Sequence, residues 1–131
     1  MRIFVVYGSS QVAARVIYAL QRIPSVRFVG QAHDDDVSIP AIRSSQPDVV
    51  MFIGLRLDAQ ELRRILDGLR QRKPIPRILL MADQPFTQYA REWKRIGADH
   101  VFEASTEFTT MIDMFRSERI MADPGSGGGQ L

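Results

Sequence analysis

The sequence predicts an α/β fold in which a parallel five-stranded sheet of order 2-1-3-4-5 is doubly wound, with helices on both faces. Three observations favour it. An unbroken apolar run, residues 49–53, lies mid-chain between Pro47-Asp48 and Gly54, which is typical of a strand buried on both sides. A second apolar run, residues 3–7, opens the chain. Strand-like runs alternate with segments of helical period through short connections, as parallel strands joined by helices require.

The first strand–helix unit is expected over residues 3–7 and 11–23. Gly8-Ser9-Ser10 ends the strand, and either serine suits a helix N-cap. Apolar residues then recur at helical spacing until Pro24 stops the helix. The unit therefore places a serine-containing loop at the carboxyl end of the first strand.

The second unit is weaker in pattern. A short strand over residues 26–31 shows partial alternation, and residues 32–36 form a polar connection. Pro40 suits the first turn of a helix, so the following helix should begin near Ser38 and run to residue 45. The central strand comes next.

After the central strand, Asp58 and Glu61 have the spacing of a capping box, which predicts a helix over residues 58–71. Its buried face carries leucines and isoleucine, and its exposed face carries arginines. A stiff turn at residues 73–76 then leads into the fourth strand, residues 78–81.

The last two helices flank a short fifth strand. Pro85 opens a helix that runs to residue 96, and Gly97 is its expected left-handed C-terminal residue. The fifth strand covers residues 100–102. Ser105 or Thr106 should cap a final helix that reaches about residue 120.

Length and composition indicate one domain, residues 1–121, followed by a flexible Gly-rich tail or linker, residues 122–131. Such a tail would suit fusion to a further C-terminal domain. The formal net charge of +2 is too small to favour nucleic acid, and the absence of cysteine excludes disulfides and thiolate chemistry. No apolar run approaches a membrane span, so we expect a cytoplasmic protein without membrane association.

Two segments resemble the receiver domains of bacterial two-component response regulators. Residues 47–52 are similar to the run that leads to the phosphorylated Asp, and residues 97–99 to the turn before the fifth strand. The similarity extends over residues 1 to about 120. The resemblance implies a flavodoxin-like (βα)5 sandwich and a place in bacterial signal transduction.

The residues that carry the family's chemistry are substituted in this sequence. The resemblance aligns its magnesium-binding acidic pair with Tyr7 and Gly8 and its phospho-acceptor with Ile53. The family's conserved hydroxyl residue aligns with Met81, its switch aromatic with Val101 and its lysine with Ala104. Magnesium requires hard oxygen ligands and phosphoryl transfer requires a nucleophile, which these side chains do not supply. We therefore expect neither aspartyl phosphorylation nor magnesium binding, and no enzymatic activity.

Other polar residues have ordinary structural interpretations. Asp34, Asp35 and Asp36 predict a solvated loop that caps the next helix, although a displaced acceptor carboxylate would also lie near this edge. Asp83 suits a turn. His33 and His100 are far apart in sequence, and no further ligand stands at metal spacing from either.

An alternative function uses the loop Gly8-Ser9-Ser10, which is similar to the phosphate loop of flavodoxins and would bind FMN or a small phosphate ligand. The loop lacks the further Gly and Thr of that family, and no aromatic pair is placed to enclose a flavin. No cofactor is therefore expected. Trp93 follows the helical apolar spacing and predicts a packing role.

The favoured interpretation is a phosphorylation-independent receiver-like domain that acts as a protein–protein interaction module. The family commonly uses the face made by its fourth helix, fifth strand and fifth helix. The charged residues expected on that face are Arg91, Lys94, Arg95, Glu103, Arg116 and Arg119. The ordinary interpretation of these basic residues is a solvated face. As a basic patch they would instead favour an acidic partner, or the face would form a homodimer.

Overall fold

The computed structural model of the protein describes residues 1–55, 58–82 and 87–122, with the backbone alone for residues 87–90. Pro85, expected to open a helix, Asp83 and the Gly-rich segment 123–131 lie outside the described residues. Within the described chain, one five-stranded sheet has the order β2-β1-β3-β4-β5, and all four strand pairings are parallel. The predicted fold class is confirmed.

The strands lie within two residues of their predicted bounds. They are β1 (Arg2–Tyr7), β2 (Arg27–His33), β3 (Val49–Ile53), β4 (Arg77–Ala82) and β5 (His100–Glu103). All five residues of β3 are buried, as expected for the central strand. Its odd-numbered side chains enter one core and its even-numbered side chains the other, because successive residues point to opposite faces.

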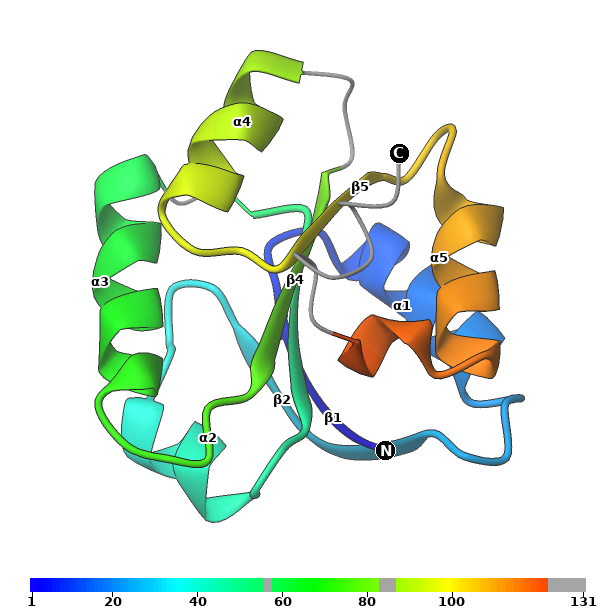
Figure 1. Cartoon of the computed structure of the whole chain (residues 1–131), viewed down its shortest axis with the longest axis horizontal. Coiled ribbons are helices and arrows are strands. Elements are labelled where there is room, and N and C mark those ends of the chain that lie inside the picture. The colour runs from blue at the N-terminus through cyan, green and yellow to red at the C-terminus, as the bar shows by residue number, and fades with distance from the viewer. Residues whose placement is uncertain (56–57, 83–86, 123–131) are drawn as a thin grey trace.

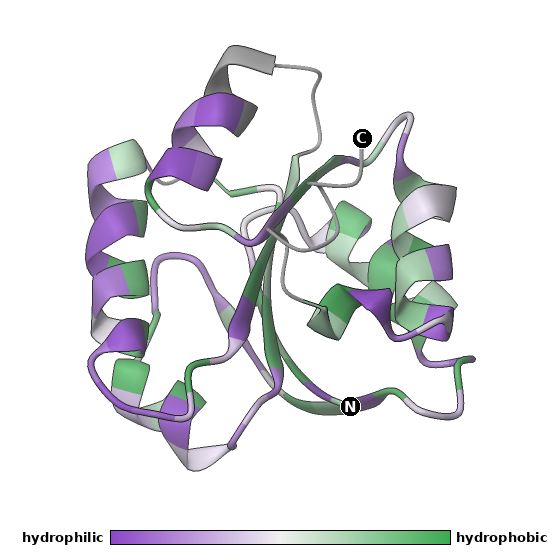
Figure 2. Ribbon diagram, viewed as in Figure 1, coloured by the Kyte–Doolittle hydropathy of each residue, from purple (hydrophilic) through white to green (hydrophobic). Residues whose placement is uncertain are grey.

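In the described part of the chain, five α-helices and one short 3₁₀-helix accompany the sheet. They are α1 (Ser10–Leu20), α2 (Ile39–Ser44), α3 (Ala59–Arg70), α4 (Thr87–Arg95), α5 (Phe108–Arg116) and η1 (Arg119–Met121). Helices α1 and α5 cover one face of the sheet, and α2, α3 and α4 cover the other (Figure 1). Figure 2 shows the apolar sides of these helices turned towards the sheet and their polar sides turned outward.

Two predicted helices are shorter than expected. Helix α1 ends at Leu20 rather than residue 23, because the Ile23 N–H donates to Leu20 O in a turn (3.0 Å). The last helix begins after Glu107, not at Ser105 or Thr106. It ends at Arg116, since Glu118 takes a left-handed conformation (φ 61°) before η1. Ile120 is nevertheless buried, which explains why the apolar pattern extended that far.

The helix caps confirm three sequence interpretations. Asp58 accepts a hydrogen bond from the Glu61 N–H at 2.8 Å, and Ser38 accepts one from the Ala41 N–H at 3.2 Å. Gly97 has a φ of 120°, a region open chiefly to glycine. These caps fix where α2, α3 and α4 meet their neighbouring strands.

Two aspartates tie the beginnings of strands together. The Arg2 N–H donates to Asp48 Oδ2 at 2.8 Å, and the Ile78 N–H donates to Asp99 Oδ2 at 2.7 Å. Each carboxylate therefore satisfies the first free backbone donor of a neighbouring strand. The Pro-Asp and Gly-Ala-Asp segments thus have a role in building this sheet.

Candidate functional site at the carboxyl edge of the sheet

The substituted positions lie together at the carboxyl edge of the central strands. Tyr7 pairs with Ile53, and Ile53 pairs with Met81 on the other side. The backbone ladder continues past the strand ends, because Gly8 N–H donates to Ile53 O at 2.9 Å. In the same way Ala104 N–H donates to the carbonyl of the residue after Met81, Ala82, at 2.7 Å. The fold therefore gathers the predicted positions where parallel sheets carry their ligands.

The centre of this edge is apolar and closed. Ile53 has no exposed surface and Met81 is 1% exposed. Ala104 is also buried, while Tyr7 and Val101 are half-buried. These side chains offer no carboxylate to a metal ion or phosphoryl group. The core of the α1–α5 face extends up to the place where open α/β sheets otherwise bind ligands.

Asp34 departs from the solvated-loop prediction. Its side chain is only 3% exposed, and its Oδ1 lies 3.3 Å from His33 Nδ1. The Asp34 N–H also donates to Tyr7 O (2.9 Å), which holds the residue against β1. Ser38, rather than an aspartate of this run, caps α2. Only the following residues, Asp35 and Asp36, are exposed as expected.

The buried carboxylate lies beside β1, not beside β3. His33, which precedes it, pairs with Tyr7, so β1 separates the end of β2 from Ile53. The His33 ring packs edge-on against Tyr7 at a centroid distance of 5.4 Å and bonds Asp35 Oδ1 at 2.7 Å. His33 and its neighbouring aspartates therefore form a hydrogen-bonded group at the carboxyl end of β2. Across residues 1–55, 58–82 and 91–122, no three His, Asp or Glu side chains converge as a metal site would require.

The loop Gly8-Ser9-Ser10 has part of its hydrogen-bonding capacity committed. Gly8 is buried and its N–H belongs to the sheet ladder, while Ser9 is the N-cap of α1. Ser9 Oγ accepts from Val12 N–H at 3.4 Å, a long bond. Ser10 is exposed. The phosphate-loop interpretation remains a prediction that this geometry does not favour.

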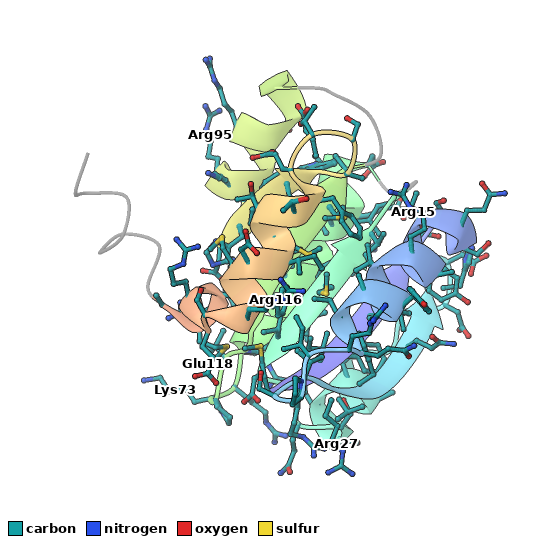
Figure 3. The ribbon with its side chains drawn as sticks, turned by 90° about the vertical axis from the view of Figure 1, so that its right-hand side faces the viewer. Arg15, Arg27, Lys73, Arg95, Arg116 and Glu118 are labelled. Carbon is teal, nitrogen blue, oxygen red and sulfur yellow. The ribbon has the colours of Figure 1, made fainter. Side chains whose placement is uncertain are left out.

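The predicted basic face is divided between two regions. Arg91, Lys94 and Arg95 are exposed on α4. Arg116 lies towards the far end of α5, well separated from Arg95 in Figure 3. Arg119 belongs to η1 beyond α5. The α4 cations therefore form one group, and the α5–η1 cations lie towards the opposite edge of the sheet.

The α5–η1 cations and Glu103 have partners nearby. Arg116 Nη1 is 3.8 Å from Asp113 Oδ1, and Arg119 Nε donates to Ser117 Oγ at 2.9 Å. Glu103 ends β5 and accepts from Thr106 Oγ1 at 3.1 Å. Both arginines are exposed, so these contacts are weak anchors.

His100 has a structural environment at the start of the edge strand β5. Its Nε2 lies 3.1 Å from Ile120 O, which connects β5 to η1. Burial lowers the pKa of His100 below its ordinary value, against the opposing influence of that hydrogen bond. Trp93 is half-buried against the core formed with α2 and α3, in agreement with its predicted packing role.

Sequence reasoning missed two features. One is the buried Asp34, which an acidic run does not distinguish from a solvated loop. The other is a basic cavity at the amino edge of the sheet, which is formed by segments far apart in the chain.

Within the described chain, no helix is both long and apolar enough to cross a membrane.

Comparison with known proteins places the fold. No family model and no curated protein matches the chain. Among solved structures, the signal receiver domain of NarL from Mycobacterium tuberculosis is 19% identical, with a TM-score of 0.74, 92% of this chain covered and 96% of that chain. The response regulator domain of Thermotoga maritima CheB is 18% identical, with a TM-score of 0.69 and coverages of 95% and 96%.

A pilus assembly-related protein from Burkholderia pseudomallei is also similar. It is 18% identical, with a TM-score of 0.69, and the match covers 94% of this chain and 90% of that chain. At these identities the likeness establishes the fold. The chain has the five-stranded, flavodoxin-like fold of response regulator receiver domains.

Proposed function

We propose that this domain is a phosphorylation-independent, receiver-like protein–protein interaction module of bacterial signalling or regulation, and not an enzyme. The observation that carries the proposal is Ile53. It is completely buried between Tyr7 and Met81, at the position that the resemblance assigns to the phospho-acceptor. A nucleophile there would have to replace a core side chain.

The chemistry of phosphoryl transfer supports this proposal. Transfer to a carboxylate requires that nucleophile and a cation to neutralise the phosphoryl oxygens. Asp34 is the nearest alternative suggested by the sequence, but it is buried beside β1 with His33 as its neighbour. It is therefore unsuited to replace the acceptor. Incubation with acetyl phosphate and Mg²⁺, followed by intact-mass spectrometry, should leave the protein mass unchanged.

The proposed interaction face is the one formed by α4, β5 and α5. Strand β5 is an edge of the sheet, and α4 presents the exposed cations Arg91, Lys94 and Arg95 beside it. The separation of these residues from Arg116 makes α4 the centre of the face and leaves α5–η1 at its margin. Such a face favours an acidic partner surface or a second copy held through the edge strand.

A charge reversal on α4 tests the location of this face. The variant Arg91→Glu with Arg95→Glu should lose a partner that the wild type captures from the host's own lysate, or lose wild-type self-association in sedimentation velocity. The matched control is Arg63→Glu with Arg64→Glu, two exposed arginines on α3. Equal capture and equal self-association by both variants would place the face elsewhere.

A further inference from the structure

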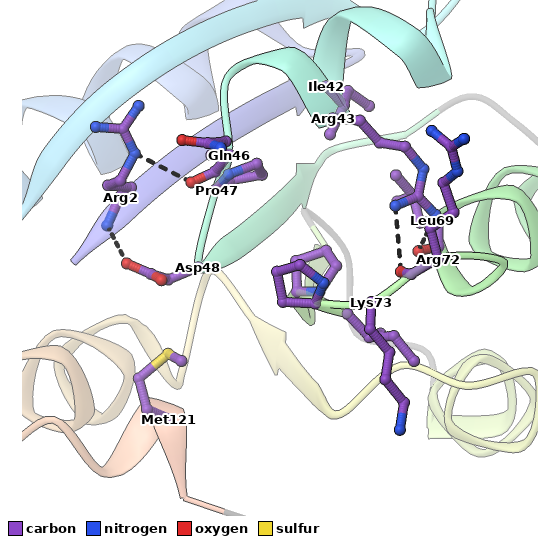
Figure 4. Close-up of a pocket in the computed structure, with 13 residues that line it drawn as sticks. Arg2, Ile42, Arg43, Gln46, Pro47, Asp48, Leu69, Arg72, Lys73 and Met121 are labelled. Atoms are coloured by element: carbon purple, nitrogen blue, oxygen red, sulfur yellow. Dashed lines mark hydrogen bonds between the residues drawn. The ribbon is translucent and has the colours of Figure 1, made fainter.

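A cavity of about 540 Å³ lies at the amino edge of the sheet, where β1, β3 and β4 begin and α2 and α3 end (Figure 4). Its apolar lining includes Ile42 and Leu69, both buried in the core beneath α2 and α3. Pro47, Pro74 and Pro76 supply further apolar wall. The cavity is therefore a recess with a fixed apolar lining.

Two exposed apolar side chains also line this recess. Ile75 is 46% exposed and Met121 is 37% exposed. Among the residues whose side chains the structure describes, only three large apolar side chains are exposed, and the third is Tyr18 on α1. Two of the three thus line the cavity, so apolar side chains are available there to contact a ligand.

The charged lining of the cavity is predominantly basic. It comprises Arg2, Arg43, Arg72 and Lys73 against one carboxylate, Asp48. That carboxylate already accepts the Arg2 N–H at 2.8 Å. The recess therefore presents a net positive potential to an incoming ligand.

Two of these cations are held in place by the fold. Arg2 Nε donates to Gln46 O at 3.0 Å, just beyond the end of α2. Arg43 Nη2 donates to Leu69 O at 2.6 Å, near the end of α3. Cations at helix C-termini complement the carbonyl dipoles there, so both guanidinium groups are ordered parts of the wall.

The other two cations are available to a ligand. Arg72 and Lys73 are exposed, and in the part of the chain that the structure describes neither side chain has a hydrogen bond or ion pair. They lie three and two residues before Ile75 in sequence and line the same recess. An apolar contact and two available cations are thus side by side.

We propose that this amino-edge pocket binds an acidic peptide segment that carries an apolar residue between its carboxylates. The apolar residue packs against Ile75 and Met121, and the carboxylates pair with Arg72 and Lys73. Charge complementarity selects the acidic partner, and the apolar lining anchors it. Lys73 lies at the opposite end of the molecule from Arg95 in Figure 3, so the site does not rest on the proposed α4 face.

Two other occupants fit the pocket less well. A symmetric dimer through this surface would bring the same Arg72 and Lys73 together, and like charges repel. An anionic membrane would meet protruding side chains, whereas Ile42 and Leu69 are recessed. A peptide side chain can enter the recess.

The experiment measures fluorescence anisotropy of a fluorescein-labelled peptide of sequence EDLFDE added to the full chain. We expect Arg72→Glu with Lys73→Glu to weaken binding by at least about tenfold, because two charge pairs become repulsive. Ile75→Ser should also weaken it. The matched control, Arg63→Glu with Arg64→Glu, and the α4 variant, Arg91→Glu with Arg95→Glu, should stay within about twofold of wild type, because none of their four arginines lines the pocket.

Five results would overturn the proposal. The wild type would fail to bind EDLFDE, or bind the basic peptide KKLFKK equally well. The Arg72–Lys73 variant and the Arg63–Arg64 control would lose affinity equally, which would indicate attraction by net charge alone. Sedimentation velocity would reveal a wild-type dimer that is lost only in the Arg72–Lys73 variant. The occupant of the pocket would then be a second copy of this chain. Phosphatidylserine vesicles would bind in place of the peptide.

Discussion

Substituting the buried Ile53 by aspartate tests whether the carboxyl edge of the sheet is part of the hydrophobic core. Ile53 has no exposed surface and pairs in register with Tyr7 and Met81. The matched reference is Ile53→Ala, which removes the packing without adding a charge. For a fully buried isoleucine, the alanine substitution should lower the free energy of unfolding by roughly 2–5 kcal/mol.

Aspartate adds an electrostatic loss to the loss of packing. An apolar site raises a carboxyl pKa from its ordinary value of about 3.9 to above 7, so the folded variant must carry the neutral acid. Since each pKa unit corresponds to about 1.4 kcal/mol, the aspartate variant should be about 4 kcal/mol less stable than the alanine variant at pH 7. That difference approaches the lower end of the whole stability of native domains, about 5–15 kcal/mol.

The assay is urea unfolding followed by far-UV circular dichroism at pH 7 and pH 5. The folded aspartate variant binds more protons than its unfolded chain, so its relative stability must rise as the pH falls. The difference from alanine should shrink from about 4 kcal/mol at pH 7 to about 1.5 kcal/mol at pH 5. If the aspartate variant is unfolded at pH 7, refolding on acidification has the same sign. An aspartate variant as stable as the alanine variant at pH 7, or one stabilised by Mg²⁺, would refute this reasoning.

Three further predictions concern caps and titration. Asp58→Ala removes the N-cap of α3 and should destabilise the domain by about 1 kcal/mol in urea unfolding. An unchanged free energy of unfolding would show that this cap does not stabilise the domain. Burial lowers the pKa of His100, so the unfolded chain binds more protons below pH 6.5 and stability should fall as pH decreases through that range. His100→Gln should flatten this dependence; a slope unchanged from the wild type would remove His100 as the cause. Arg43→Ala should lower the free energy of unfolding by about 1–2 kcal/mol because α3 carbonyls lose a charged donor, whereas an equal loss in the exposed control Arg63→Ala would contradict that role.

The strands were predictable from sequence because their signals are local. The unbroken run at residues 49–53, closed by Gly54, coincides with β3. Pro47-Asp48 also has a structural reason, since Asp48 accepts the first N–H of β1. The segments that carry the resemblance to receivers are therefore residues that build the sheet.

The remaining features depend on tertiary contacts. Asp34 is polar in an acidic run, yet β1 and His33 enclose it. The final helix was predicted too long because Ile120 is buried at helical spacing, although the left-handed Glu118 interrupts the helix before it. Neither the burial of Asp34 nor the end of the last helix can be recognised from a local stretch of sequence, because both depend on tertiary contacts.

The candidate surfaces show the same division. The sequence predicted the location of Ile53 and Met81 at one sheet edge, because strand order fixes which ends are neighbours. The amino-edge cavity combines residues from positions 2, 43, 72–73 and 121, so no motif marks it. The basic residues of α4 and α5 read as one set in sequence, but the fold separates them.

The central claim is that this domain works without a phosphoryl switch, and one titration tests it most directly. Uniformly ¹⁵N-labelled wild-type protein would be titrated with beryllofluoride and Mg²⁺, and amide shifts followed at residues 7–9, 53–54 and 81–82. The buried Ile53 predicts spectra that match those with Mg²⁺ alone. Saturable, Mg²⁺-dependent shifts at these amides would contradict the account and identify a working acceptor at the carboxyl edge.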